Sequence, residues 1–527
     1  MSLFPLTAVR PLLPTILLGA SLWAPLAACG EPDELDLAQQ EDELVRRAGA
    51  PVLLQAGAQL VALGVTDDSH ALYWRDGAVY AVALRPGAAP ELVARAGSAP
   101  QTQVVGDVAM IWTEQSPTAP PSPGPLTVWT ARDGAHQAAT ASWPPLPFAI
   151  HAGSAISPDG SALLFSANVS EDGAMGDVIL ASPDLSLQRT LVSGAQVHPQ
   201  GGCPPHLGFD RLAAGAGRAN PVALTCLGEA AQTATLARWR DAARTELAAD
   251  LAPGTWWSTD RTGAALMASR ADLSTVVFDA RDAMTVIEPR RSTGWIGPRG
   301  ELLTRVRTSP STVHINRSLA SRPQPAQPLI ELGAATGIMY ANHLPQGLNH
   351  YGRTPVPTSP DGSFYGGFSA VDPNSGLTDV YLVDLRGRNP APVQLRKQAD
   401  ALPSFELATA DSKYLLYYSY DLTSGNSTLY AGSLTGSSRQ LTTGNTVLTH
   451  YGITGSDLVF SDGAASQELG VLGTTDIKAT DVGAQAAPRL LARAAHSQFF
   501  VTRRRRLVLY TTDAGGQPGL YVVCSRP

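Results

Sequence analysis

The chain has 527 residues, a formal net charge of −7, and 16% charged against 44% hydrophobic residues. This balance excludes an intrinsically disordered chain, which combines low hydrophobicity with high net charge. It also provides no basic excess to hold nucleic acid. The 49 glycines and 41 prolines interrupt the sequence too often for a long helical bundle. They favour many short strands joined by turns.

Residues 1–28 predict an export signal. Arg10 ends a short charged start, an apolar stretch follows, and small residues precede Cys29. The sequence Leu-Ala-Ala-Cys at 26–29 resembles the lipobox of bacterial lipoproteins. That resemblance implies cleavage before Cys29 and attachment of lipid, palmitate included, to its thiol. An ordinary signal peptide and a transmembrane anchor are the alternatives.

Residues 29–51 follow as an acidic segment that we expect to be a flexible tether. An acidic docking peptide is the alternative interpretation. In enteric bacteria, an Asp directly after the lipidated cysteine resembles a signal for retention in the inner membrane. This chain has Gly30 at that position. We therefore expect an exported lipoprotein of the outer membrane, on its periplasmic face or at the cell surface. No later apolar run approaches the 18 residues of a membrane span.

Two later segments repeat the same pattern. Ser-Pro-Asp-Gly-Ser occurs at 157–161 and at 359–363, and each copy is followed by an apolar strand and a second strand beginning at Asp177 or Asp379. A weaker copy begins at Ala410-Asp411. Pro, Asp and Gly in this order favour a tight turn, so we expect Asp159, Gly160, Asp361, Gly362 and Asp411 to be structural.

A strand ending in an aromatic or apolar residue, usually followed by a hydroxyl residue, recurs ten times at a mean spacing of about 49 residues. The pairs begin at Tyr73, Trp112, Phe165, Leu224, Ala268, Leu303, Phe368, Tyr418, Phe460 and Tyr510. This period, with four short strands per unit, predicts an all-β fold, a β-propeller over residues 52–527.

The Asp-containing turns resemble the PD40 (WD40-like) repeats of TolB-type propellers. Propellers usually have four to eight blades, so we favour a ring of seven or eight four-stranded blades with insertions, although ten candidate units are present. We expect the first strand to pair into the last blade, where residues 507–523 form a closing hairpin.

Cys203 and Cys226 lie in one candidate unit, and export favours a disulfide between them. Cys524 is left either free or bridged. The alternative is a metal site formed by His198, Cys203 and His206, because zinc accepts imidazole and thiolate ligands. The irregular, Pro- and Gly-rich context of these residues makes that site the weaker interpretation, and no cofactor is expected.

Catalytic signatures are missing from the sequence, including a Gly-x-Ser-x-Gly elbow, a P-loop and His-Glu-x-x-His. We therefore expect a non-catalytic, membrane-anchored scaffold that binds another envelope or secreted protein, with no nucleic acid and with membrane contact through lipid alone. The alternative is a glycan-binding or carbohydrate-active propeller with a site in the funnel, as in oligogalacturonate lyase, which these repeats also resemble. Four arginines at 503–506 fit either a solvated sheet edge or contact with lipid phosphates or an acidic glycan.

Overall fold

The computed structural model describes residues 50–525 with gaps, of which the longest are 114–121, 145–153, 212–218, 334–358, 443–449 and 463–473. The described residues form 39 β-strands and no helix. They therefore include no helix that is long and apolar enough to span a membrane.

The strands form ten antiparallel sheets, named here blades 1 to 10 in chain order. Blade 1 contains β2 (Val61–Thr66), β3 (His70–Arg75), β4 (Ala78–Ala83) and β5 (Glu91–Arg95). Blade 2 contains β6 (Gln101–Val105), β7 (Val108–Trp112), β8 (Gly124–Thr130) and β9 (Gly134–Ser142). Blade 3 contains β10 (Ser154–Ile156), β11 (Leu163–Ala167), β12 (Met175–Ala181) and β13 (Gln188–Gln196). Blade 4 contains β14 (His206–Phe209), β15 (Pro221–Thr225), β16 (Ala234–Arg240) and β17 (Ala243–Leu251). Blade 5 contains β18 (Trp257–Thr259), β19 (Ala265–Ser269), β20 (Thr275–Asp279) and β21 (Met284–Glu288).

Blade 6 contains β22 (Ser292–Ile296), β23 (Glu301–Arg307), β24 (Thr312–Leu319) and β25 (Arg322–Gly333). Blade 7 has three described strands, β26 (Phe364–Phe368), β27 (Thr378–Asp384) and β28 (Pro392–Ala399). Blade 8 contains β29 (Ser404–Ala408), β30 (Tyr414–Tyr420), β31 (Ser427–Ser433) and β32 (Ser438–Gln440). Blade 9 contains β33 (His450–Gly452), β34 (Asp457–Asp462), β35 (Thr474–Asp481) and β36 (Arg489–His496). Blade 10 contains β37 (Phe500–Val501), β38 (Leu507–Thr512), β39 (Gly519–Cys524) and β1 (Val52–Ala56).

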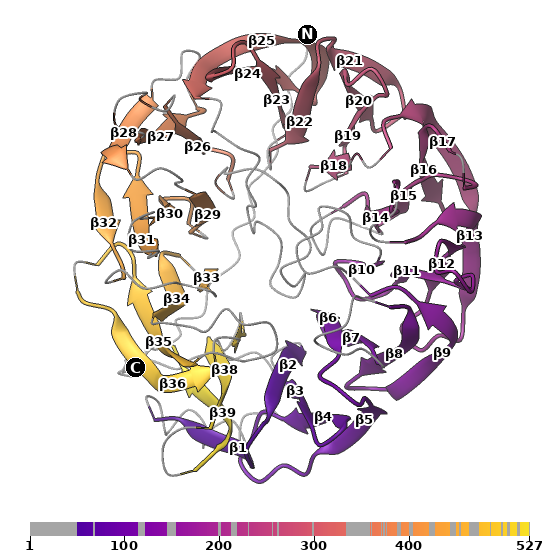
Figure 1. The fold of residues 1–527 in the computed structure, drawn as a ribbon, viewed down its shortest axis with the longest axis vertical. Helices are drawn as coiled ribbons and strands as arrows, with labels where there is room; N and C mark the ends of the chain where they lie inside the picture. The colour runs from indigo at the N-terminus through magenta and orange to yellow at the C-terminus, as the bar shows by residue number, and fades with distance from the viewer. Residues whose placement is uncertain are drawn as a thin grey trace, which may run out of the picture.

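The blades stand side by side in one closed ring, with the first strand of each nearest the centre and the last at the rim (Figure 1). This is a β-propeller. The second strands, such as β7, β11 and β15, are buried along their whole length. A strand with sheet on both sides and a neighbouring blade on each face needs apolar side chains on both faces, which explains these continuous apolar runs.

The ring closes through its first strand. β1 pairs antiparallel with β39, with Val52 opposite Val522 and Ala56 opposite Gly519, so blade 10 combines the two ends of the described chain. The expected closing hairpin is formed by β38 and β39, whose registers run from Leu507–Cys524 to Thr512–Gly519. The predicted closure is therefore confirmed.

Ten apolar clusters form the core of the described residues, one between each pair of neighbouring blades. Consecutive side chains on a second strand point to opposite faces of the blade and so belong to two different clusters. Val508 packs toward blade 9, for example, and Leu509 packs toward blade 1. Each blade is thus bounded by apolar packing on both faces, and the described ring has no end blade that must cap an exposed core.

The prediction of a β-propeller is confirmed, but the preference for seven or eight blades is wrong. All ten predicted strand ends lie at or within the second strand of a separate blade, and in blade 7 the matching strand is β26. Blades 4, 5 and 6, where the repeat pattern is weakest, are complete four-stranded sheets rather than insertions. Their second strands carry apolar residues suited to that position, although the turns before them lack the Ser-Pro-Asp-Gly sequence.

Candidate functional site

The repeated Asp turns at Asp159 and Asp411 connect the first and second strands of blades 3 and 8, and the turn at Asp361 immediately precedes β26 of blade 7. In the first, the Ser157 hydroxyl donates to Asp159 Oδ1 at 2.6 Å, and the Ser161 backbone N–H donates to the same oxygen at 3.1 Å. Gly160 takes a φ of 70°, which a side chain would strain. Burial would raise the pKa of Asp159, but the hydrogen bonds from Ser157 and Ser161 outweigh it and hold that pKa below its usual value.

The other two turns repeat this geometry and also join neighbouring blades. Asp361 Oδ1 accepts from the Ser359 hydroxyl at 2.7 Å, and Gly362 again has a positive φ. Asp411 Oδ1 accepts from Thr409 at 2.7 Å, while its Oδ2 accepts from Ser456 of the next blade at 2.6 Å. The carboxylates therefore hold their own turns and, at Asp411, the adjoining blade.

Cys203 and Cys226 are joined by a disulfide, with Cα atoms 5.9 Å apart. The two histidines of the alternative metal site lie against tryptophans. The His198 ring contacts Trp143 at 4.9 Å between centroids, and His206 Nδ1 accepts the Trp257 backbone N–H at 3.1 Å. The disulfide occupies the one thiolate that the metal site needs. Within the described part of the chain, no three His, Cys, Asp or Glu residues gather in a way that could hold a metal ion.

A Thr–His–Asp chain joins blades 9 and 10. His496 Nδ1 lies 3.0 Å from Thr511 Oγ1, and His496 Nε2 lies 3.2 Å from Asp513 Oδ2. Asp513 also accepts the Gln59 backbone N–H at 2.9 Å. The order of groups matches a nucleophile–base–acid relay, but Thr511 is 1% exposed and has no space for a substrate carbonyl. The chain therefore fastens the closing blade to its neighbours.

The six tryptophans whose side chains the structure describes do not gather on an exposed face. Trp112, Trp129, Trp143, Trp239 and Trp257 are buried. The half-buried Trp74 donates its indole N–H to the Ala96 carbonyl at 2.8 Å. Their rings serve the packing between strands and blades.

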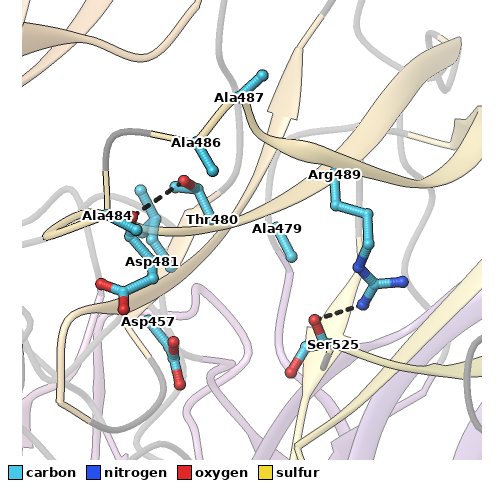
Figure 2. Close-up of a pocket in the computed structure, with 10 residues that line it drawn as sticks. Asp457, Ala479, Thr480, Asp481, Ala484, Ala486, Ala487, Arg489 and Ser525 are labelled. Atoms are coloured by element: carbon cyan, nitrogen blue, oxygen red, sulfur yellow. Dashed lines mark hydrogen bonds between the residues drawn. The ribbon is translucent and has the colours of Figure 1, made fainter. Parts of the chain in front are cut away.

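A pocket of about 420 Å³ opens where blade 9 meets the end of blade 10 (Figure 2). Three separate segments line it: the start of β34, the stretch from the end of β35 to the first residue of β36, and the residue after β39. The lining residues are Asp457, Leu458, Ala479, Thr480, Asp481, Ala484, Ala486, Ala487, Arg489 and Ser525.

The pocket wall is held in shape by an arginine outside it. Arg439 of blade 8 donates to the carbonyls of Val482, Ala484 and Ala486 in the connection between β35 and β36. These bonds fix a connecting segment that is not itself paired in a β-sheet. The alanine methyl groups that face the cavity are thereby kept in place.

Charged side chains lie on opposite sides of the pocket (Figure 2). Arg489 Nη2 donates to the carbonyls of Cys524 at 3.1 Å and Ser525 at 2.6 Å. On the other side, Asp457 Oδ2 lies 3.4 Å from Arg506, the last residue of the four-arginine run. Burial lowers the pKa of Arg489, and no acid among the described residues offsets that effect.

Sequence reasoning missed this pocket. Its residues belong to no motif, and Arg489 differs from other arginines only in what the fold places beside it. The one sequence signal nearby is the arginine run at 503–506, of which Arg506 faces Asp457 and residues 503–505 lie outside the described residues. The predicted lipidation site Cys29 also lies outside them.

Comparison with known proteins gives a likeness of architecture. No family model and no curated protein matches the chain. Among solved structures, oligogalacturonate lyase from Vibrio parahaemolyticus is 11% identical, with 81% of this chain and 98% of that chain covered and a TM-score of 0.33. An oligogalacturonate lyase in complex with manganese is 13% identical, covering 80% and 98% at a TM-score of 0.33. A prolyl endopeptidase is 15% identical, covering 79% and 51% at a TM-score of 0.37.

The strand topology alone defines the class of this protein as a β-propeller with ten blades among its described residues. At these identities and TM-scores, the similar structures carry no inference about binding or activity. The resemblance to TolB-type PD40 repeats stays a prediction, since no family model matches.

Proposed function

We propose that the chain is an exported lipoprotein whose propeller binds another envelope or secreted protein and performs no chemistry itself. Lipid on Cys29 would anchor it, and residues 29–51 would link the anchor to the ring. Acyl chains contribute about 0.8 kcal/mol per buried CH₂, so several chains hold a protein stably at a membrane.

One observation carries the proposal most directly. The proposed tether leads into β1, and β1 is the outermost strand of the blade that closes the ring. A tether attached there leaves the rest of the rim and both faces of a rigid ring accessible to a partner. The inter-blade hydrogen bonds at Asp411 and His496 support the rigidity that a scaffold needs.

The anchor is tested by Cys29→Ser. We expect this variant to leave the membrane fraction while its propeller stays folded, as judged by the β-sheet signal in circular dichroism. A variant that remains membrane-bound would show that the anchor is elsewhere.

The scaffold role is tested by crosslinking in native envelopes, followed by affinity purification and mass spectrometry. We expect one protein to be recovered reproducibly and to be lost when loops on one face are changed. Recovery of no specific protein would contradict the scaffold role. The glycan-binding or carbohydrate-active alternative would then be tested with acidic oligosaccharides and by metal analysis of the purified protein.

A further inference from the structure

The pocket between blades 9 and 10 contains a guanidinium group without an acidic partner. Arg506, next to the pocket, has a carboxylate partner, since it faces Asp457. Arg489 instead bonds to two main-chain carbonyls, both through Nη2. Its Nε and Nη1 donors have no partner among the described residues. Because Nε–H and the Nη1 N–H groups point in different directions, one carboxylate oxygen can take a charge-assisted hydrogen bond from Nη1, and its second oxygen needs another donor.

A second unsatisfied group lies beside it. Ser525 is 6% exposed, and its hydroxyl has no hydrogen-bond partner among the described residues. Buried hydroxyl groups are normally bonded. Since Arg489 donates to the carbonyl of this same residue, its hydroxyl and the guanidinium lie on the same side of the pocket (Figure 2). A ligand carboxylate that reaches Arg489 is therefore within range of a further donor after a rotation of the Ser525 hydroxyl.

The rest of the pocket limits what the carboxylate is attached to. Alanine methyl groups and Leu458 form much of the lining, which suits short aliphatic groups. A volume of about 420 Å³ is in the usual range for small-ligand pockets. Asp457 and Asp481 on the opposite side disfavour a second negative charge and favour N–H groups. Polyanions and phosphate fit this distribution of charge poorly.

We propose that this pocket binds the α-carboxylate of a small aliphatic amino-acid residue, with Arg489 as the principal donor. The carboxylate belongs either to a free amino acid or to the C-terminus of a partner protein. The second case rests on the proposed scaffold function and gives it a docking site at the junction of blades 9 and 10.

The test uses the full-length protein in detergent and isothermal titration with four probes: L-alanine, acetyl-trialanine with a free carboxylate, the same peptide as its amide, and inorganic phosphate. We expect at least tenfold tighter binding of one of the two free carboxylate probes than of the amide or phosphate. Tight binding of L-alanine identifies a free amino acid, whereas binding of the peptide alone identifies a chain end.

Variants locate the site. Arg489→Gln should weaken the favoured probe at least tenfold, and Ser525→Ala about threefold. Arg244→Gln is the matched control, since that exposed arginine pairs with Glu246 on blade 4 and should leave binding unchanged. Thermal melts establish that each variant is folded.

The proposal is overturned if no free carboxylate binds more tightly than the amide, or if Arg489→Gln and Ser525→Ala both bind as the unaltered protein does. Failure of the scaffold function is a separate result. In that case, the envelope crosslinking recovers no partner, while the purified protein still binds L-alanine through Arg489.

Discussion

Replacing Arg238 with methionine should destabilise the junction of blades 4 and 5 severely. Arg238 is 1% exposed and faces Asp210 at 3.5 Å and Asp282. The change leaves Asp210 buried with no cation, although Asn220 still donates to both of its oxygens. At an effective dielectric constant of 20, the 3.5 Å pair alone is worth about 5 kcal/mol. Loss of one partner from a buried pair typically costs about 3–5 kcal/mol.

Urea unfolding followed by tryptophan fluorescence measures this cost, and Trp257 in the apolar cluster between blades 4 and 5 reports on the junction. Adding Asp210→Asn to Arg238→Met should recover at least about 1 kcal/mol, because the uncompensated charge is removed. Arg244→Met is the control, since its partner is exposed and such pairs contribute about 0–1 kcal/mol. A loss below about 1 kcal/mol for Arg238→Met would refute the reasoning.

Three further changes test other parts of the fold. Cys203→Ala with Cys226→Ala opens a link that spans 23 residues and should cost about 3 kcal/mol in urea unfolding; an unchanged midpoint would contradict this. Hydrogen bonds, first from Ser182, hold the pKa of Asp184 at about 2. Because the folded pKa lies below the unfolded value, this turn should remain intact at pH 4 and lose the stabilisation as the pH falls toward 2. Ser182→Ala should move the titration upward in ¹³C-carboxyl NMR, and an unmoved curve would exclude that bond as the cause. Gly367→Ala places a methyl group 2.6 Å from a buried leucine of blade 6 and should cost about 1–3 kcal/mol; a tolerated alanine would show that the junction can expand.

The sequence predicted the blades better than their number. A second strand must be apolar on both faces and turn sharply at each end, so its composition marks it even where the turn sequence has diverged, as at Leu224 and Ala268. The expectation of seven or eight blades follows from the usual range of four to eight blades and not from the chain. The chain itself carried ten signals, and each corresponds to a real blade.

The turn at 182–187 has the same Ser-x-Asp spacing as the repeated turns, at a place where no turn is predicted from the sequence. Ser182 and Asp184 reproduce the hydroxyl-to-carboxylate bond of the repeated turns, although they connect the third and fourth strands of blade 3. The same Ser-x-Asp spacing therefore marks tight turns at several places in a blade. It locates turns well but does not by itself assign them to a strand pair.

The pocket could not be predicted from the sequence for a different reason. Asp457, Arg489 and Ser525 come from three separate segments and meet only because the last blades are adjacent in the ring. Whether an arginine has an acidic partner depends on which residues the fold places beside it. The spacing of residues along the chain does not indicate this.

The pairing of β1 with β39 also determines how the ring responds to mechanical load. A pull on the chain before Val52 that is directed along the axis of β1 runs parallel to its partner strand. The backbone bonds from Val52 to Ala56 are then strained together in shear, rather than opened one after another as in unzipping. Because β1 is also the strand that completes blade 10, its sliding would remove the pairing through which the two ends of the described chain share one blade.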